Sequence, residues 1–123
     1  MTDSELSRLL RSLDPILQPG EFAFRSLTHD AEPPAEAVAW FREAEGTSTI
    51  VPATVESERF AWISLGVESS LTCVGLTAAV ATALARAGIA CNVVAAARHD
   101  HLFVPVNRAT EAVEVLKRLQ AEF

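Results

Sequence analysis

The clearest alternation of apolar and polar positions lies in the second half of the chain. Side chains alternate from Phe60 to Val67, which predicts a strand with one buried face. The alanine-rich segment Val74–Ala87 has apolar residues at helical spacing, and Gly88 is well placed to end a helix. Two apolar runs, Cys91–Ala96 and His101–Val106, then flank a short polar turn, as the arms of a hairpin do. This order predicts most of a small sheet covered by a helix.

The same spacing predicts which face of each element is buried. In the first strand, one face is expected to carry Ala61, Ile63, Leu65 and Val67, and the other Phe60 and Trp62. In the helix, the inward stripe is expected to comprise Val74, Thr77, Ala78, Ala81 and Leu84, with Val80 and Ala87 beside it. The chain closes with a predicted amphipathic helix over residues 109–120, with inward positions Ala112, Val113, Leu116 and Leu119.

The first half of the chain carries weaker signals. Residues 2–13 predict an opening helix, because Thr2 and Glu5 fit a capping box and the leucines share one face. Residues 37–52 fit two structures, a helix that ends at Gly46 or a hairpin that turns there. Local signals leave this choice open.

An internal comparison favours the hairpin. The segment Glu21–Leu27 (EFAFRSL), itself a predicted strand, matches Arg59–Leu65 (RFAWISL). Downstream, Ile50–Pro52 matches Phe103–Pro105, and the extra spacing in the second copy is about four turns of helix. The chain therefore reads as two copies of one unit, strand, helix, strand, turn, strand, with the helix missing from the first.

Composition narrows the class of protein. The 123 residues are half hydrophobic, which suits a folded domain with one ordinary core. The formal net charge of −6 argues against nucleic acid or an anionic membrane as partner. No apolar run reaches the roughly 20 residues of a membrane helix, and the first residues lack a signal-peptide pattern, so a cytoplasmic location is expected. The two cysteines, Cys73 and Cys91, are expected to be small buried apolar residues in a reducing compartment.

The polar junction Ser69–Gly75, between the predicted strand and helix, is the leading candidate for a binding site. Ser69, Ser70 and Thr72 supply compact hydrogen-bonding groups, and Gly75 lets the backbone approach a ligand. The first turn of the following helix offers free N–H groups and the positive end of the helix dipole. These features suit a carboxylate, such as the α-carboxylate of an amino acid. The alternative is that Ser70 or Thr72 merely caps the helix.

Other polar side chains follow the predicted helix. Asn92 is expected to lie near the junction, where its amide can either bind an amino or carboxylate group of a ligand or satisfy an edge-strand backbone group. His99 and His101 are two apart, so in a strand both point to one face and can contact a ligand. A zinc site needs three or four protein ligands, and the other histidine, His29, lies in the first copy, so no metal is predicted. Asp100 is expected to form the turn by bonding its side chain to the backbone.

A thiol and a set of aromatic residues complete the candidates. Cys73 lies near a helix start, where a cysteine can serve as a nucleophile, but no motif around it supports catalysis. Four aromatic residues on matching faces of the repeat strands are expected to pack between the copies or beneath the opening helix: Phe22, Phe24, Phe60 and Trp62. If exposed, they would form an association surface.

Residues 69–75, 76–80 and 87–93 read SSLTCVG, LTAAV and AGIACNV. The segment has a strand, a loop ending in glycine, a helix, and then Ala-Gly-Ile before a new strand. In this order of elements it resembles ACT domains, which are small ferredoxin-like regulatory modules. More narrowly, VGLTAAVATALARAGIACNVVA followed by HDHLFVPV is similar to small stand-alone bacterial proteins with tandem ACT-like units, related to the ACT modules of the CASTOR arginine sensors. Two positions depart from these patterns. Val74 stands where the common ACT loop has proline, and Ala97-Arg98 where the narrower group often has aromatics.

The resemblance implies an α+β fold, a ferredoxin-like ACT sandwich with an antiparallel sheet and helices on one face. It implies two tandem units, a degenerate one with the opening helix in residues 1–55 and a complete one in residues 56–123. It further implies a non-enzymatic regulatory or sensor protein without a cofactor. Such a protein would bind an amino acid or similar small carboxylate, form a homodimer, and act on a regulated protein partner.

The ligand would lie in a groove between units or protomers. The residues expected to bind it are Ser69, Ser70, Leu71, Thr72, Val74, Gly75, Leu76, Asn92, His99 and His101. Two alternatives stay open from the sequence. One is a protein-interaction module that binds no ligand, and the other is a small metal- or thiol-dependent enzyme centred on His99, His101 and Cys73.

Overall fold

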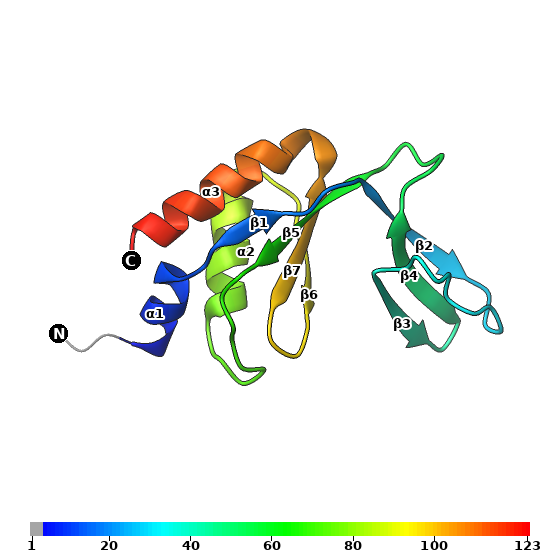
Figure 1. Ribbon diagram of the computed structural model, residues 1–123, viewed down its shortest axis with the longest axis horizontal. Coiled ribbons are helices and arrows are strands. Elements are labelled where there is room, and N and C mark those ends of the chain that lie inside the picture. The colour runs from blue at the N-terminus through cyan, green and yellow to red at the C-terminus, as the bar shows by residue number, and fades with distance from the viewer. Residues whose placement is uncertain (1–3) are drawn as a thin grey trace.

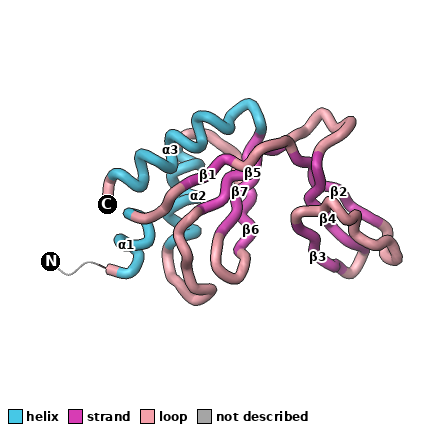
Figure 2. Tube along the Cα trace, in the orientation of Figure 1, coloured by secondary structure: helices cyan, strands magenta, loops and turns pink. Residues whose placement is uncertain are grey.

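The computed structural model describes residues 4–123 as three α-helices and one antiparallel sheet (Figure 1). The helices are α1 (Glu5–Arg11), α2 (Leu76–Arg86) and α3 (Ala109–Ala121), with a short 3-10 helix, η1 (Val106–Arg108), before α3. The strands are β1 (Pro15–Leu17), β2 (Phe22–Leu27), β3 (Ala39–Glu43), β4 (Gly46–Pro52), β5 (Phe60–Leu65), β6 (Asn92–Ala95) and β7 (Asp100–Pro105). The helices gather beside β1, β5, β6 and β7, whereas β2, β3 and β4 extend away from them (Figure 2). The predicted α+β class is confirmed.

Two strand triplets of matching design build the sheet. The strand order is β3-β4-β2-β5-β7-β6, and β1 also pairs with β5. The triplets meet where Phe22 of β2 pairs with Phe60 of β5. In each triplet this phenylalanine lies opposite a proline, Pro52 in the first and Pro105 in the second. These equal registers confirm the tandem repeat predicted from the sequence.

Residues 37–52 form the hairpin of the first triplet, not the alternative helix. Strands β3 and β4 pair from Ala39 opposite Ile50 to Glu43 opposite Gly46. A side chain at Gly46 would collide with the backbone carbonyl of Leu27, so the close approach of β2 requires glycine here. The first copy thus keeps its three strands and lacks the helix of the second copy.

The N-terminal segment completes the helix-covered part of the sheet. Helix α1 begins at Glu5, and the side chain of Ser4 caps it by accepting a hydrogen bond from the backbone N–H of Ser7 at 3.0 Å. The predicted capping box includes Thr2, which lies outside the described residues. Strand β1 then pairs with β5, and Gln120 of α3 holds the intervening turn by bonding to the backbone of Arg11 and Asp14. The segment before β2 therefore packs with the second triplet.

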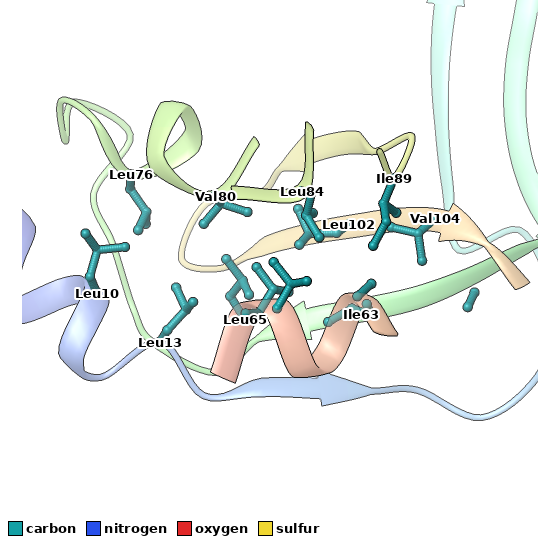
Figure 3. Close-up of a cluster of buried hydrophobic side chains, with 14 residues drawn as sticks. Leu10, Leu13, Ile63, Leu65, Leu76, Val80, Leu84, Ile89, Leu102 and Val104 are labelled. Atoms are coloured by element: carbon teal, nitrogen blue, oxygen red, sulfur yellow. The ribbon is translucent and has the colours of Figure 1, made fainter. Parts of the chain in front are cut away.

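The main core lies between the helices and this part of the sheet (Figure 3). Ile63 and Leu65 of β5 and Leu102 of β7 face the helices and are fully buried. From the opposite side, Leu84 of α2 and Leu116 of α3 fill the space between the layers. Complete burial of each such side chain contributes about 1.5–3 kcal/mol, so this layer supplies most of the stability.

The buried face of α2 differs from the predicted stripe. Leu76, Val80 and Leu84 face the core, whereas Thr77 is exposed and Val74 is 87% exposed. Ala78 of the predicted stripe is also exposed. The helix begins only at Leu76, so Val74 belongs to the loop before it. The larger aliphatic side chains, spaced four apart, bury more apolar area than alanine and threonine and so turn toward the sheet.

A second, aromatic cluster lies on the opposite face of the sheet. Phe22 and Phe103 are buried at its centre. The rings of Phe22 and Trp62 meet edge to face with centroids 5.5 Å apart, and those of Phe24 and Phe60 at 5.0 Å. The repeat-strand aromatics therefore pack between the two copies, as predicted, although Phe24 stays partly exposed.

Replacing Leu84 by alanine should lower the free energy of unfolding by about 2–5 kcal/mol, because it leaves a cavity in the core. Urea denaturation followed by circular dichroism measures this change. Val74→Ala is the matched control, and its effect should stay within about 0.5 kcal/mol because Val74 is exposed. Equal losses at the two positions would contradict the observed orientation of α2.

Candidate functional site

The loop Ser69–Gly75 connects β5 to α2 and lies against the turn between β6 and β7. The backbone N–H of Ser69 donates to the carbonyl of Arg98 at 2.9 Å, which holds loop and turn together. Between them is a hollow of about 60 Å³. It is lined by Ser69, Ser70, Leu71, Cys73, Leu76, Thr77, Ala95, Ala96 and Asp100. The structure thus brings most of the predicted loop residues to one small cavity.

The start of α2 has no side-chain cap. Gly75 occupies the N-cap position with a φ of 102°, a left-handed conformation that favours glycine. The hydroxyls of Ser70 and Thr72 lie 3.4 Å from each other and do not bond to the helix, so the capping alternative is wrong. The first intrahelical bond runs from Ala79 to the carbonyl of Gly75. The N–H groups of the first turn before it are therefore left to a ligand or solvent.

Asp100 reaches the same hollow from β7. Its side chain alternates with those of Leu102 and Val104, so all three point toward the helices. Asp100 is only 9% exposed, yet no group of residues 4–123 hydrogen-bonds to its carboxylate or forms an ion pair with it. The predicted turn-forming bond from this side chain to the backbone is therefore wrong. Since no fully buried side-chain oxygen of residues 4–123 lacks a partner, this carboxylate opens to the hollow and is available to a ligand.

His101 is held on the opposite face of β7. The indole N–H of Trp62 donates to Nδ1 of His101 at 3.0 Å, and the Ser64 hydroxyl lies 3.0 Å from the same atom. Gln18 in turn donates to that hydroxyl at 3.2 Å. Since an indole N–H can only donate, Nδ1 carries no proton and the hydrogen of the neutral ring lies on Nε2.

The environment of His101 favours this neutral form. Burial lowers the pKa of His101 below its ordinary value of 6.5, and the nearby charge of His99 acts in the same direction. The carboxylate of Asp100 opposes both effects. The ring of His99 is held separately, with Nδ1 3.1 Å from the backbone carbonyl of Leu65. Because a carbonyl only accepts, the proton of His99 lies on Nδ1.

Asn92 does not join the loop. It begins β6, at the end of the strand away from Ala95 and Ala96, which line the loop hollow. There it borders a separate surface depression with Phe24 and Phe60. Asn92 was expected near the loop, but the length of β6, four residues, separates it from the loop.

The geometry gives little support to the alternative of a metal- or thiol-dependent enzyme. Within residues 4–123, no three histidine, cysteine, aspartate or glutamate side chains are grouped as metal ligands. Burial raises the pKa of the Cys91 thiol to about 11, which suppresses the reactive thiolate. Cys73 is half-buried at the hollow and packs against the core. In the same described range, no helix has the length and apolar character needed to cross a membrane.

Asp100 lines the hollow although the sequence pattern did not indicate it as a candidate binding residue. Its alternation with Leu102 and Val104 was a usable signal, because it places the carboxylate on the helix side of β7. Together the hollow presents a positive helix end and a negative side chain. This combination suits a small zwitterion.

The protonation of His101 provides a test of the network on the other face. NMR titration of its ring protons should give a pKa below 6.5. Because the unfolded chain keeps the ordinary pKa, it binds protons at higher pH than the folded chain does. The free energy of unfolding should therefore decrease as the pH falls below about 6.5, and His101→Gln should reduce this dependence.

Trp62→Phe is the companion variant for this titration. It removes one of the two groups that occupy Nδ1 and leaves Ser64, so the pKa of His101 should rise toward its ordinary value. A pKa at or above 6.5 in the unaltered protein would contradict the described hydrogen bonding.

Comparisons with known proteins agree with this architecture. An ACT-domain model matches residues 2–59, and a different ACT-domain model matches residues 57–118. A solved structure from Vibrio cholerae, a protein of unknown function described as a possible transport protein, is 36% identical, with a TM-score of 0.75 over 89% of this chain and 92% of that one. An Agrobacterium tumefaciens protein shares the fold, with a TM-score of 0.68 and 18% identity over 88% of this chain and 89% of its own.

No curated protein matches this chain. ACT domains are regulatory modules rather than catalytic ones, and they commonly bind small ligands and dimerise. With ACT-type units in tandem along its length, this chain belongs to the ACT-domain family.

Proposed function

We propose that this protein is a non-catalytic sensor that binds a free amino acid at the start of α2. The observation that carries the proposal is Asp100, a nearly buried carboxylate without a partner among residues 4–123, beside an uncapped helix start. A regulatory, small-ligand role follows from the family. What we add is that the ligand is an amino acid and that it binds at the start of α2.

The two charged groups of an amino acid match the two ends of the hollow. Its α-carboxylate would accept hydrogen bonds from the free N–H groups at Leu76 and Thr77, where the helix dipole is positive. Its α-ammonium would pair with the carboxylate of Asp100, which lines the hollow and has no other partner among residues 4–123. The hydroxyls of Ser69 and Ser70 lie at the same hollow and would complete the hydrogen bonding.

The size of the hollow implies that the site is completed from outside. A volume of about 60 Å³ equals the share of roughly two water molecules in the liquid. It accommodates the charged groups of an amino acid but leaves the ligand side chain beyond its rim. We infer that a second copy of the chain covers that side chain, in a homodimer with the ligand between protomers. Ala95 and Ala96, on the edge strand β6 and just beyond it, would lie next to this interface.

A thermal-shift screen with the common amino acids tests the proposal. A ligand present at 100 times its Kd should stabilise the folded protein by about 2.7 kcal/mol. The N-acetyl and amide derivatives of the active amino acid should give no comparable shift, because each lacks one of the two charges. No shift with any amino acid at millimolar concentration would favour the alternative of a protein-interaction module without a ligand.

Asp100→Asn should remove the shift, measured against the melting temperature of the free variant. The amide keeps the size of the side chain but cannot balance an ammonium group. Glu68→Gln is the matched control, since Glu68 pairs with Arg98 nearby but does not line the hollow. An unchanged shift in Asp100→Asn would contradict the role assigned to Asp100.

A further inference from the structure

The two ends of the sheet face each other across a groove. Strands β3 and β6 are the two edge strands of the sheet and do not pair with each other. Curling of the sheet nevertheless places β3 on the side of β6 away from the helices (Figure 1). Residues of both strands line two hollows. The hollows have volumes of about 380 and 160 Å³ and share Ala39 of β3 and Val94 of β6. The two hollows therefore adjoin and are together called the groove; the larger one is in the size range of small-ligand sites.

The walls of this groove are apolar and exposed. Phe41 of β3, which points to the same face as Ala39, is 73% exposed, and Phe24 from β2 is also open to solvent. Ile50 and Val93 add to the lining of the larger hollow. Large apolar side chains gathered at one exposed groove indicate a surface that another molecule covers.

His101 supplies a directed polar group at the narrow end of the groove. It lines the smaller hollow with Trp62 and Phe103. Trp62 and Ser64 both occupy Nδ1, so the remaining ring nitrogen, Nε2, carries the hydrogen. Among residues 4–123, no group accepts a hydrogen bond from it. The groove thus combines apolar walls with one fixed N–H donor.

We propose that this groove binds a small apolar carboxylate, with the carboxylate accepting a hydrogen bond from Nε2 of His101. The apolar body of the ligand would lie along Phe24, Phe41 and Val94. This site is distinct from the amino-acid site, since Asp100 and His101 are consecutive in β7 and point to opposite faces of the sheet. The proposal does not depend on amino-acid binding.

Octanoate and octylammonium test the proposal as a pair with the same apolar chain and opposite head groups. Isothermal titration calorimetry at neutral pH should show saturable binding of octanoate, about tenfold tighter than octylammonium, because only octanoate accepts the hydrogen bond. Non-specific attraction to a chain of net charge −6 would give the opposite preference. In NMR spectra, octanoate should shift the ring signals of His101.

Two variants locate the binding. Ala39→Leu fills the groove where its two hollows join and should abolish octanoate binding, whereas the exposed Ala35→Leu, outside the lining, should leave it unchanged. His101→Leu removes the ring donor and leaves an apolar side chain in its place. It should weaken octanoate about tenfold and leave octylammonium unaffected, which keeps the test valid if Ala39→Leu fails to fold.

Three results would overturn the proposal. The first is the absence of octanoate binding up to millimolar concentration, and the second is equal affinity for the two head groups. The third is that a second copy of the chain already covers the groove. Light scattering would then show a dimer that Ala39→Leu converts to a monomer, and octanoate would have no effect.

Discussion

The pairing of Phe22 with Phe60 is the interaction on which the arrangement of this protein depends. It is the register position at which the two triplets join, and the flanking aromatic rings reinforce it. Edge-to-face ring pairs contribute about 0.5–1.5 kcal/mol each beyond the burial of their surface. Phe103 packs against both Phe22 and Phe24, so rings from β2 and β7 interlock across β5. This junction joins the two halves of the sheet, and the strands at their far ends line the groove.

The sequence was most informative where local pattern and burial coincide. The alternation in Phe60–Leu65 and the similarity of Glu21–Leu27 to Arg59–Leu65 led to the strands, the tandem repeat and the hairpin at residues 37–52. These features depend on side-chain alternation, which a strand displays directly in its sequence. The ACT-domain resemblance followed from the same region and is confirmed.

Features that depend on distant contacts or on one backbone angle were not predictable. Pairing of β1 with β5 joins segments far apart in the chain, and no local signal encodes it. The left-handed Gly75 delays the start of α2 to Leu76, which removed Val74 from the expected stripe. Asp100 looked like a turn residue because His-Asp-His follows a polar turn, and only its place in β7 directs it to the hollow.

The two proposed sites lie back to back on one strand. Asp100 faces the start of α2, His101 faces the aromatic cluster, and the carboxylate of Asp100 already influences the charge of His101. A cation bound at Asp100 would offset that influence, so the two faces share an electrostatic connection over one residue. If both proposed ligands bind, this connection would let a ligand at one site change the free energy of binding at the other.

The central claim is that an amino acid binds between the start of α2 and Asp100. The most direct measurement is an ¹H–¹⁵N NMR titration of the isotope-labelled protein with the amino acid that stabilises it most. The account predicts saturable shifts of the backbone N–H signals of Leu76, Thr77 and Asp100. Shifts confined to β3 and the aromatic face, with the α2 signals unmoved, would contradict it.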